Sequence, residues 1–403
     1  MKIILHTMYY LPDFGSAPIL MDELAGYLAA AGHEVEVVTT MPRTRGEEFS
    51  GRFYSRSEDR GFVVKRFWTD RAPSPLGRLL AWNIYAAGAL LNLLTTRKSD
   101  IFFLRTPPLQ LGLPAFWAKN ARGARVLLNV QDIHPDLAIK SGILRNPAGI
   151  RFAKALERWV YRLADRIVVI SDGFKRNLRD KGVSERKIEV LPNWVDTGFL
   201  RPMAKDNPVS RKHGLHDKFV VMYSGTVSIS SNLALERVLD AAKLLAGDPE
   251  ILFVIAGEGL RKDALRAKAD SLGLRNAAFL PFQPYRDLPE MLASSDILLV
   301  PLDRDKSQLS VPSKLYNFMA AGRPILGLTA PDSEVAALIH ENACGLTVPP
   351  DGAASIADAV MALKRSPERR RVLGEHAREH VARHFAKEKI LRSYDRLLRS
   401  MVS

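Results

Sequence analysis

The segment from Lys2 to Thr39, KIILHTMYYLPDFGSAPILMDELAGYLAAAGHEVEVVT, decides the fold. Its first apolar run, KIILHTMY, predicts a buried strand, and its last run, EVEVVT, predicts a second one. Between them, leucines recur at every fourth position after Ser16 and Gly32 ends the pattern, which predicts a helix. A strand, a loop, a helix and a strand in this order are the repeating unit of a doubly wound parallel sheet.

The same alternation continues along the chain and then starts again. Its 403 residues suit two domains of about 200 residues each. The predicted strands are DIFFL, RVLLNV, RIVVI and KIEVL in the first series, and FVVMY, ILFVI, AAFL, DILLV and RPILGL in the second. We therefore expect an α/β fold with two Rossmann-like domains that face a central cleft, an arrangement suited to an enzyme that joins two substrates.

The domain boundaries follow from the polar stretch between the two series. Residues 198–217 contain two prolines and Gly214 and are interpreted as a linker. The first domain is expected at 1–197 and the second at 218–384. The charged, helical C-terminal segment 385–403 is expected to pack back on the first domain.

The composition limits the classes of function. The formal net charge is +14, of which residues 1–200 contribute +9, and this excess suits phosphorylated substrates or an anionic membrane surface. A nucleic-acid partner is not expected, because no DNA- or RNA-binding motif is present. The single cysteine, Cys344, allows no disulfide within the chain, suits a reducing compartment, and is expected to pack as a small apolar residue. His6 interrupts the N-terminal apolar run, so a signal peptide is not expected either.

The segment Leu79–Leu94, LLAWNIYAAGALLNLL, is the most apolar part of the chain. It has sixteen residues, fewer than the roughly 18–20 that a membrane span requires. Two interpretations stay open: a buried helix, and a helix that lies in a bilayer surface. The cations Arg78, Arg97 and Lys98 flank it and would suit the second.

Two loops of the first domain carry candidate binding residues. Gly15 and Ser16 form a flexible turn and a helix cap that could approach a ligand closely. Gln131, Asp132 and His134 follow the predicted strand 125–130 and place polar groups at its carboxyl end. The alternatives are a plain connecting loop and a structural histidine, and no second His or Cys stands at metal-binding spacing.

Two loops of the second domain are candidates for a phosphate site. The first follows the strand FVVMY and places Gly225 among hydroxyl groups before a helix, a setting in which phosphate binds. Those hydroxyls belong to Ser224, Thr226, Ser228, Ser230 and Ser231. The second loop contains Gly257, Glu258 and Gly259 between a strand and a helix. An ordinary serine-rich loop remains the alternative.

The stretch VPSKLYNFMAAGRP at 311–324 places a cation where a helix begins. Pro312 suits a first helical turn, and free backbone N–H groups there, together with the Lys314 ammonium, would form an anion site. Asn317 lies three residues further on the same face and could bind a sugar hydroxyl. The alternative is that Lys314 points to solvent.

These residues resemble those of glycosyltransferase family 4 enzymes with the two-domain GT-B fold. The resemblance covers essentially the whole chain. It rests on ERWVYRLADRIVVISDGFKRNL and KIEVLPNWVD in the first domain, and on IAGEGLRKDALRAKADSLGL, AFLPF and DILLVPL in the second. PSKLYNFMAAGRPIL is similar to the branch that assembles bacterial surface polysaccharides, including fucosamine-transferase-like and colanic-acid-type enzymes.

The resemblance implies a retaining transfer from a nucleotide sugar, with the nucleotide on the second domain and the acceptor on the first. No metal cofactor would be required, because Lys314 would neutralise the leaving diphosphate. Asp132 and Lys314 would be catalytic, and Gln131 and His134 would lie on the acceptor side. The donor site would consist of Gly15, Ser224, Gly225, Thr226, Gly257, Glu258, Gly259, Phe282, Pro312, Ser313, Lys314 and Asn317.

This chain departs from the family pattern at several positions. Many members carry two glutamates where it has Leu309 and Asn317. Many have an Arg and a Lys in the loop that is hydroxyl-rich here, which would leave Lys314 with more of the diphosphate. Many also have His-Asp in place of Gln131-Asp132.

We therefore expect a sugar transferase that uses a UDP-sugar donor and a polyprenyl-diphosphate-linked saccharide acceptor. It would act in the cytoplasm, on the inner face of the plasma membrane. Two alternatives stay open: a sugar-nucleotide 2-epimerase of the same fold, and a non-catalytic member that binds a nucleotide or scaffolds an assembly complex.

Overall fold

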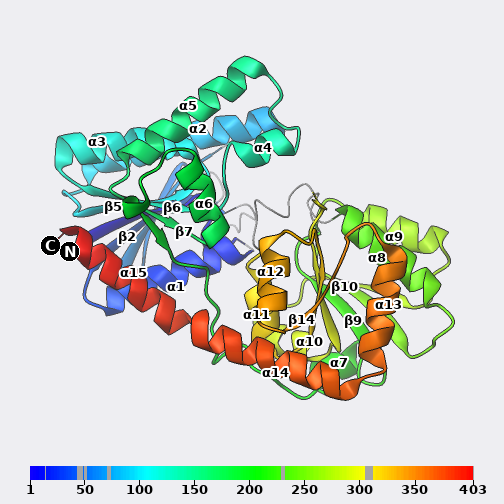
Figure 1. Ribbon diagram of the computed structural model, residues 1–403. Helices are drawn as coiled ribbons and strands as arrows, with labels where there is room; N and C mark the ends of the chain where they lie inside the picture. Colours follow the sequence, from blue (N-terminus) through cyan, green and yellow to red (C-terminus); the bar gives the residue numbers. More distant parts are fainter. Residues whose placement is uncertain are drawn as a thin grey trace. The chain divides into compact units, whose positions relative to one another are not determined.

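The computed structural model describes residues 1–13, 15–42, 49, 52–69, 74–227, 232–304 and 312–402 (Figure 1). The chain forms two compact units. Unit 1 comprises Met1–Asn193 and Ile390–Ser403, and unit 2 comprises Trp194–Lys389. Both are Rossmann-like α/β units built on parallel sheets, as the alternation of strands and helices predicts.

Unit 1 has an eight-stranded sheet in the order β3-β4-β2-β1-β5-β6-β7-β8, in which only β3 pairs antiparallel. The apolar runs lie inside the sheet: Ile3, Ile4 and Leu5 of β1 are fully buried. Its strands are β1 (Lys2–His6), β2 (Glu34–Thr40), β3 (Tyr54–Asp59), β4 (Phe62–Phe67), β5 (Ile101–Thr106), β6 (Arg125–Val130), β7 (Arg166–Val169) and β8 (Ile188–Val190).

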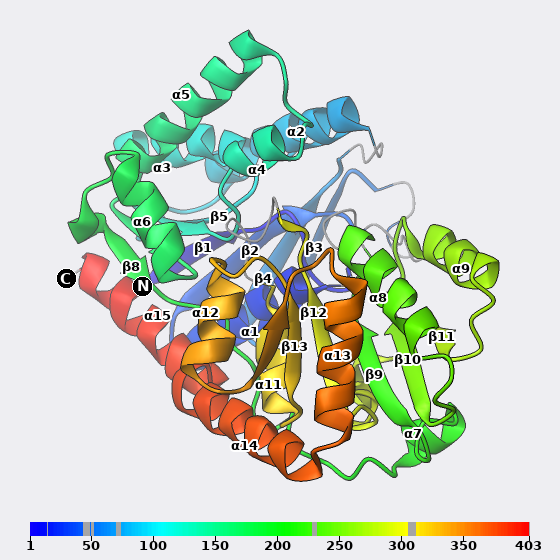
Figure 2. The ribbon, with the colours of Figure 1, turned by 45° about the vertical axis from the view of Figure 1, so that its right-hand side comes forward.

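Helices cover both faces of this sheet (Figure 1). The longer ones are α1 (Ser16–Ala30), α2 (Pro75–Thr95), α3 (Gly112–Arg122), α5 (Pro147–Leu163) and α6 (Asp172–Asp180), with the short α4 (Asp136–Lys140) after β6. In Figures 1 and 2, α2, α3 and α5 form a layer on one face, and α1 and α15 (Lys387–Val402) lie on the other. From Ile390 onward α15 belongs to unit 1, and its buried Tyr394 hydroxyl accepts a hydrogen bond from Asn129 Nδ2 at 2.7 Å.

Unit 2 has a six-stranded parallel sheet in the order β11-β10-β9-β12-β13-β14. Its strands are β9 (Phe219–Ser224), β10 (Ile251–Ala256), β11 (Ala277–Leu280), β12 (Ile297–Pro301), β13 (Ile325–Leu328) and β14 (Gly345–Val348). Its helices are α7 (Pro208–Lys212), α8 (Asn232–Leu244), α9 (Lys262–Ser271), α10 (Leu288–Ala293), α11 (Lys314–Ala320), α12 (Glu334–Glu341), α13 (Ala353–Lys364) and α14 (Pro367–His384). Alternate residues of β9 and β10 pack with α8, α9 and α13 in one apolar core.

The stretch 198–217, interpreted from the sequence as a linker, is part of unit 2. It contains α7, whose N-terminus is closed by a capping box between Asn207 and Ser210. Asn207 Nδ2 also donates to the carbonyl of Glu290 at 3.1 Å, and Ser210 is fully buried. The side chains of Asn207 and Ser210 therefore fix this segment to unit 2. Its prolines and polar composition did not predict these contacts.

The apolar segment Leu79–Leu94 lies within α2 and is only partly buried. Tyr85, Ala89 and Leu93 face the core, while Leu91 and Leu94 are more than half exposed. One face of this helix is therefore buried, as the first interpretation expects, and the other face is exposed. Among the described residues, none of the helices combines the length and the apolar character needed to cross a bilayer.

Candidate active site

Lys314 is the first residue of α11 and the cation that the sequence singles out in unit 2. Its ammonium donates to the Tyr223 hydroxyl at 2.6 Å and lies 4.1 Å from the centre of the Tyr223 ring. That hydroxyl in turn donates to the carbonyl of Thr226 at 2.6 Å. The contacts hold the ammonium beside the carboxyl end of β9, so the alternative in which Lys314 points freely to solvent is wrong.

Gly225 makes room for this ammonium. A Cβ added at Gly225 would lie 2.6 Å from Lys314 Nζ, and the residue has φ of +145°, which L side chains rarely adopt. The ammonium therefore packs directly against the backbone of the β9–α8 loop at Gly225.

The predicted glycines Gly257 and Gly259 bring a second loop against the first. A Cβ at Gly257 would lie 2.0 Å from the Gly225 carbonyl oxygen, and one at Gly259 would lie 2.2 Å from the Val227 carbonyl oxygen. Gly225 N–H donates to Ala256 at 2.9 Å, and Val227 N–H donates to Glu258 at the same distance. Two backbones can approach this closely only without side chains between them.

The two loops and α11 meet at one edge of the sheet. β10, β9 and β12 are neighbours, and the loops after β9 and β10 and the segment leading to α11 follow their carboxyl ends. Open parallel sheets bind ligands at this edge. Of the predicted donor residues, the structure thus brings Gly225, Gly257, Gly259 and Lys314 together.

The other donor residues predicted around the start of α11 are Pro312, Ser313 and Asn317. Pro312 is not in the first helical turn: α11 begins at Lys314, and Ser313 is its N-cap, without a side-chain cap. Since α11 has only seven residues, we assign the positive charge here to the ammonium and not to a helix dipole. Asn317, one turn further, is half-buried.

The remaining donor candidates occupy varied positions. Glu258 is half-exposed and forms a 2.7 Å ion pair with Lys262. Phe282 is 42% exposed, Thr226 is exposed and Ser224 is half-buried. The candidates Ser228, Ser230 and Ser231, and the departure at Leu309, lie outside the described residues.

Two functional candidates of unit 2 were not identified from the sequence. Tyr223 was interpreted only as a strand residue, although it positions Lys314. Asp303 is nearly buried, and its carboxylate accepts from the N–H of Ala234 in the first turn of α8 at 3.2 Å. In the sequence, its signal is an acidic residue two positions after the apolar strand that ends at Pro301.

In unit 1, Gly15 adopts φ of +124° and is itself the N-cap of α1, so the cap assigned to Ser16 was one residue out. Among the described residues that are not its chain neighbours, the heavy atom nearest to a Cβ built there is Pro18 Cδ, at 4.0 Å.

Gln131, predicted on the side of the sugar acceptor, has its side-chain amide engaged by the buried amides of Asn129 and Asn193. Its Nε2 donates to Asn129 at 2.8 Å, and its Oε1 accepts from Asn193 at 2.9 Å. Asn129 continues the chain to Tyr394 on α15. The hydrogen bonds of Asn129 and Gln131 thus connect three segments of unit 1: the end of β6, the segment at Asn193, and α15.

Asp132 and His134 lie beyond this chain and are both half-buried. Burial lowers the pKa of the His134 imidazole, while the negative charge of Asp132 opposes that shift. Burial also lowers the pKa of Arg105, and Asp132 again acts in the opposite direction. His134 packs edge-on to Trp82 with ring centres 5.9 Å apart. The Asp132 carboxylate therefore interacts electrostatically with both His134 and Arg105.

Cys344 is buried, and burial raises the pKa of its thiol to about 12, so the expectation that it packs as a small apolar residue is confirmed. Across the described residues, no group of three or more His, Cys, Asp or Glu side chains is placed to hold a metal ion.

Comparisons with known proteins match both units. The model of the glycosyl transferase 4-like domain matches residues 19–194, and that of the glycosyl transferases group 1 matches residues 206–380. The chain is 29% identical to a colanic acid biosynthesis glycosyl transferase of Escherichia coli K12, WcaI, over 98% of each chain.

Solved structures share the fold at low sequence identity. Anabaena HepE, crystallised with UDP, has a TM-score of 0.74 and 16% identity, over 99% of this chain and all of its own. WaaG, a glycosyltransferase of lipopolysaccharide biosynthesis, has a TM-score of 0.70 and 18% identity, over 96% and 98% of the two chains.

Proposed function

Because the chain belongs to the glycosyltransferases, with a glycosyl transferase 4-like domain before a glycosyl transferases group 1 domain, we propose that it moves a sugar from a UDP-linked donor to a lipid-linked saccharide. The acceptor would be a polyprenyl-diphosphate-linked intermediate in the assembly of a bacterial surface polysaccharide. The similarity to WcaI and WaaG supports this setting. The transferase families that the chain matches favour sugar transfer over epimerisation.

The observation that carries the proposal is the Lys314 ammonium at the carboxyl edge of the unit 2 sheet. It is held by Tyr223 against the Gly225 backbone, where a donor diphosphate would meet a full positive charge. A cation in this position stabilises the negative charge that grows on a leaving diphosphate, and such electrostatic stabilisation is usually the largest part of catalysis. The fold shared with a UDP-bound structure supports UDP as the nucleotide.

The proposed reaction retains the anomeric configuration. The acceptor hydroxyl would attack on the face from which the diphosphate departs, and a departing phosphate oxygen would take the hydroxyl proton. Lys314 would neutralise the leaving group without a metal, and Asp132 would orient one of the two sugars. No strong protein base is then required, which suits the depressed pKa of His134.

A thermal-shift screen tests the donor assignment. We expect UDP to raise the melting temperature more than GDP, ADP or dTDP at equal concentration, because a ligand that binds only the folded state stabilises it by about 2.7 kcal/mol at 100 times its Kd. A larger shift with another nucleotide would replace UDP in the proposal. No shift with any of the four would remove the nucleotide-sugar donor from it.

The second part of the proposal is a membrane surface formed by the α2, α3 and α5 layer of unit 1. Nine large apolar side chains on the described parts of these helices are exposed, which is unusual for a solvated surface. They are Leu76, Leu79, Leu80, Leu90, Leu91, Leu94, Leu113, Phe116 and Phe152. Exposed cations lie on or beside the same helices: Arg78, Arg97, Lys98, Arg151, Lys154 and Arg158. Apolar groups bordered by cations fit a bilayer that contains anionic lipids.

Leu91→Glu is expected to weaken binding to phosphatidylglycerol-containing vesicles about tenfold, since burying one leucine contributes about 1.5–3 kcal/mol. Co-sedimentation measures the bound fraction. Leu244→Glu is the matched control, because Leu244 is 61% exposed on α8 of unit 2 and Leu91 is 59% exposed. Equal binding by the two variants, or no binding by the wild type, would contradict the membrane assignment.

A further inference from the structure

Arg105 of unit 1 is a half-buried arginine that the proposed reaction does not use. It is the penultimate residue of β5, a strand that lies between β1 and β6 in the centre of the sheet. Arg105 therefore lies at the carboxyl edge, where doubly wound sheets bind ligands. Asn129, its neighbour on β6, and the Gln131 and Asp132 that follow β6 lie at the same edge.

The Arg105 guanidinium has no direct partner within the part of the chain that the structure describes. No hydrogen bond or ion pair joins it to a described residue, and the groups whose charges act on it are Asp132, from beyond ion-pair distance, and Tyr394. A guanidinium has five N–H donors, and buried charges are usually paired. Burial lowers the pKa of Arg105, so its charge is held at a cost that these two groups do not fully offset.

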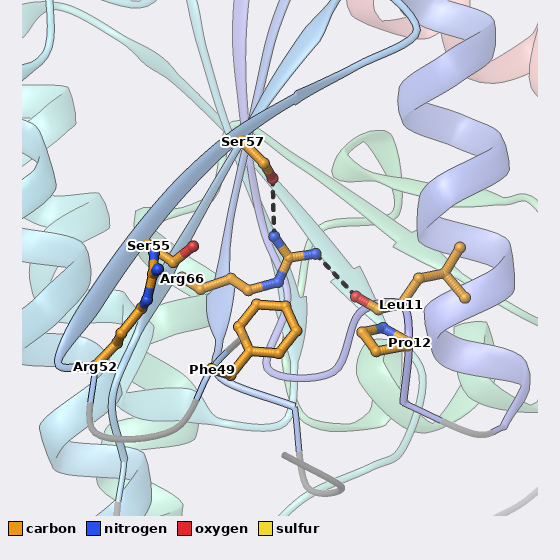
Figure 3. Close-up of a pocket in the computed structure, with 7 residues that line it drawn as sticks. All are labelled: Leu11, Pro12, Phe49, Arg52, Ser55, Ser57 and Arg66. Atoms are coloured by element: carbon orange, nitrogen blue, oxygen red, sulfur yellow. Dashed lines mark hydrogen bonds between the residues drawn. The ribbon is translucent and has the colours of Figure 1, made fainter. Parts of the chain in front are cut away.

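Arg66 shows how the same unit satisfies a buried arginine. Its Nη1 donates to the Ser57 hydroxyl at 3.1 Å, and its Nη2 donates to the Leu11 carbonyl at 2.9 Å (Figure 3). Arg105 has no such bonds to the described residues, which indicates that a ligand supplies its partner.

The polar groups around Arg105 are neutral and hydrogen-bonded to one another. The Tyr394 hydroxyl accepts from Asn129 Nδ2 at 2.7 Å, and Gln131 links Asn129 with Asn193. Burial raises the pKa of Tyr394, so its hydroxyl stays protonated at neutral pH. These groups therefore fix the surroundings of the guanidinium without neutralising its charge.

We propose that Arg105 binds an oxyanion of the acceptor: a phosphate of the diphosphate that joins the saccharide to its lipid, or a carboxylate on the saccharide. A planar guanidinium binds either group through two parallel N–H···O hydrogen bonds. Arg105 would thus hold the anionic part of the acceptor near Asp132, which is proposed to orient a sugar. Calling the ligand an acceptor rests on the proposed function, whereas the binding of an oxyanion can be measured without turnover.

Titration calorimetry with two probes tests the site, with UDP in excess so that the probes do not occupy the donor site. Farnesyl diphosphate represents the lipid diphosphate, and methyl glucuronide represents a carboxylate on the saccharide. We expect Arg105→Met to weaken the binding of at least one probe about tenfold or more, because hydrogen bonds between two charged groups are lost. Arg125→Met is the matched control. Arg125 is an exposed arginine at the start of β6, at the opposite edge of the sheet, and its loss should change the affinity less than twofold.

The melting temperature distinguishes a binding role from a structural one. Methionine lacks the charge but retains an unbranched side chain, so Arg105→Met removes the cost of burying a charge that has no direct partner. We therefore expect Arg105→Met without ligand to melt at or above the wild-type temperature while its affinity for the probe falls. Arg105→Lys keeps a positive charge and should restore part of that affinity.

The probe that loses affinity identifies the oxyanion as the lipid diphosphate or the sugar carboxylate. Failure of both probes to bind the wild type, equal affinities in Arg105→Met and Arg125→Met, or a lower melting temperature of Arg105→Met with unchanged affinity would overturn the site. Inorganic phosphate that binds as tightly as farnesyl diphosphate would overturn the lipid diphosphate as the ligand. UDP affinity should be the same in wild type and variants, and failure of the wild type to bind UDP would count against the donor assignment alone.

Discussion

Lys314→Ala is expected to lower kcat by about 100- to 1,000-fold, which corresponds to the loss of one well-placed group that stabilises transition-state charge. The ammonium is the group that Tyr223 positions over Gly225, so its removal leaves the departing diphosphate without its cation. KM for the donor should rise much less than kcat falls, because the interaction strengthens as charge develops. UDP release from the donor that the nucleotide screen identifies measures both constants.

The fold should tolerate this change. Alanine suits the first turn of α11, and the Tyr223 hydroxyl keeps its hydrogen bond to the Thr226 carbonyl. Lys243→Ala removes an equal charge from the exposed end of α8 and should leave kcat within twofold. If Lys314→Ala turns over at the wild-type rate while its melting temperature is unchanged, the catalytic role of Lys314 is wrong.

Local patterns in the sequence predicted much of the fold. Strand β9 could be predicted because FVVMY is a continuous apolar run. Gly257 and Gly259 could be predicted as site residues because glycines between a strand and a helix allow close backbone contact. β3 and β4 were not predicted. β3 is polar and mostly exposed at the edge of the sheet, so it lacks the apolar run of a buried strand.

What the sequence could not predict depends on partners that are distant in the chain. Tyr223 positions a lysine 91 residues away, and Asn129 meets Tyr394 across 265 residues. Gln131 looked like an acceptor contact because it follows a strand, whereas its amide is engaged by Asn129 and Asn193. A loop position shows that a polar group is available at the sheet edge, but only the packing decides whether that group remains available for a ligand.

Gly257→Ala is expected to destabilise unit 2 by about 2–6 kcal/mol and to abolish transfer together with UDP binding. The new Cβ would lie 2.0 Å from the Gly225 carbonyl oxygen, and φ of +145° is strained for alanine. Backbone strain of this kind costs about 1–3 kcal/mol, and forced overpacking costs a further 1–3 kcal/mol. The obstacle is backbone, so it cannot rotate away, and the melting temperature should fall by roughly 10 °C.

Two further alanine substitutions show whether the contact between the loops, and not the loss of a glycine in general, is responsible. Gly247→Ala places a Cβ in open space in the same unit, and its melting temperature should stay within 2 °C of wild type. Gly225→Ala meets the movable end of Lys314, so we expect a smaller fall in stability than for Gly257→Ala but a large loss of kcat, because the ammonium is displaced from the diphosphate site. If the melting temperatures of Gly257→Ala and Gly247→Ala are equal and Gly257→Ala binds UDP normally, the donor site does not require the close backbone contact between the two loops. If Gly225→Ala keeps wild-type kcat, the position of the Lys314 ammonium seen here is not the one used in transfer.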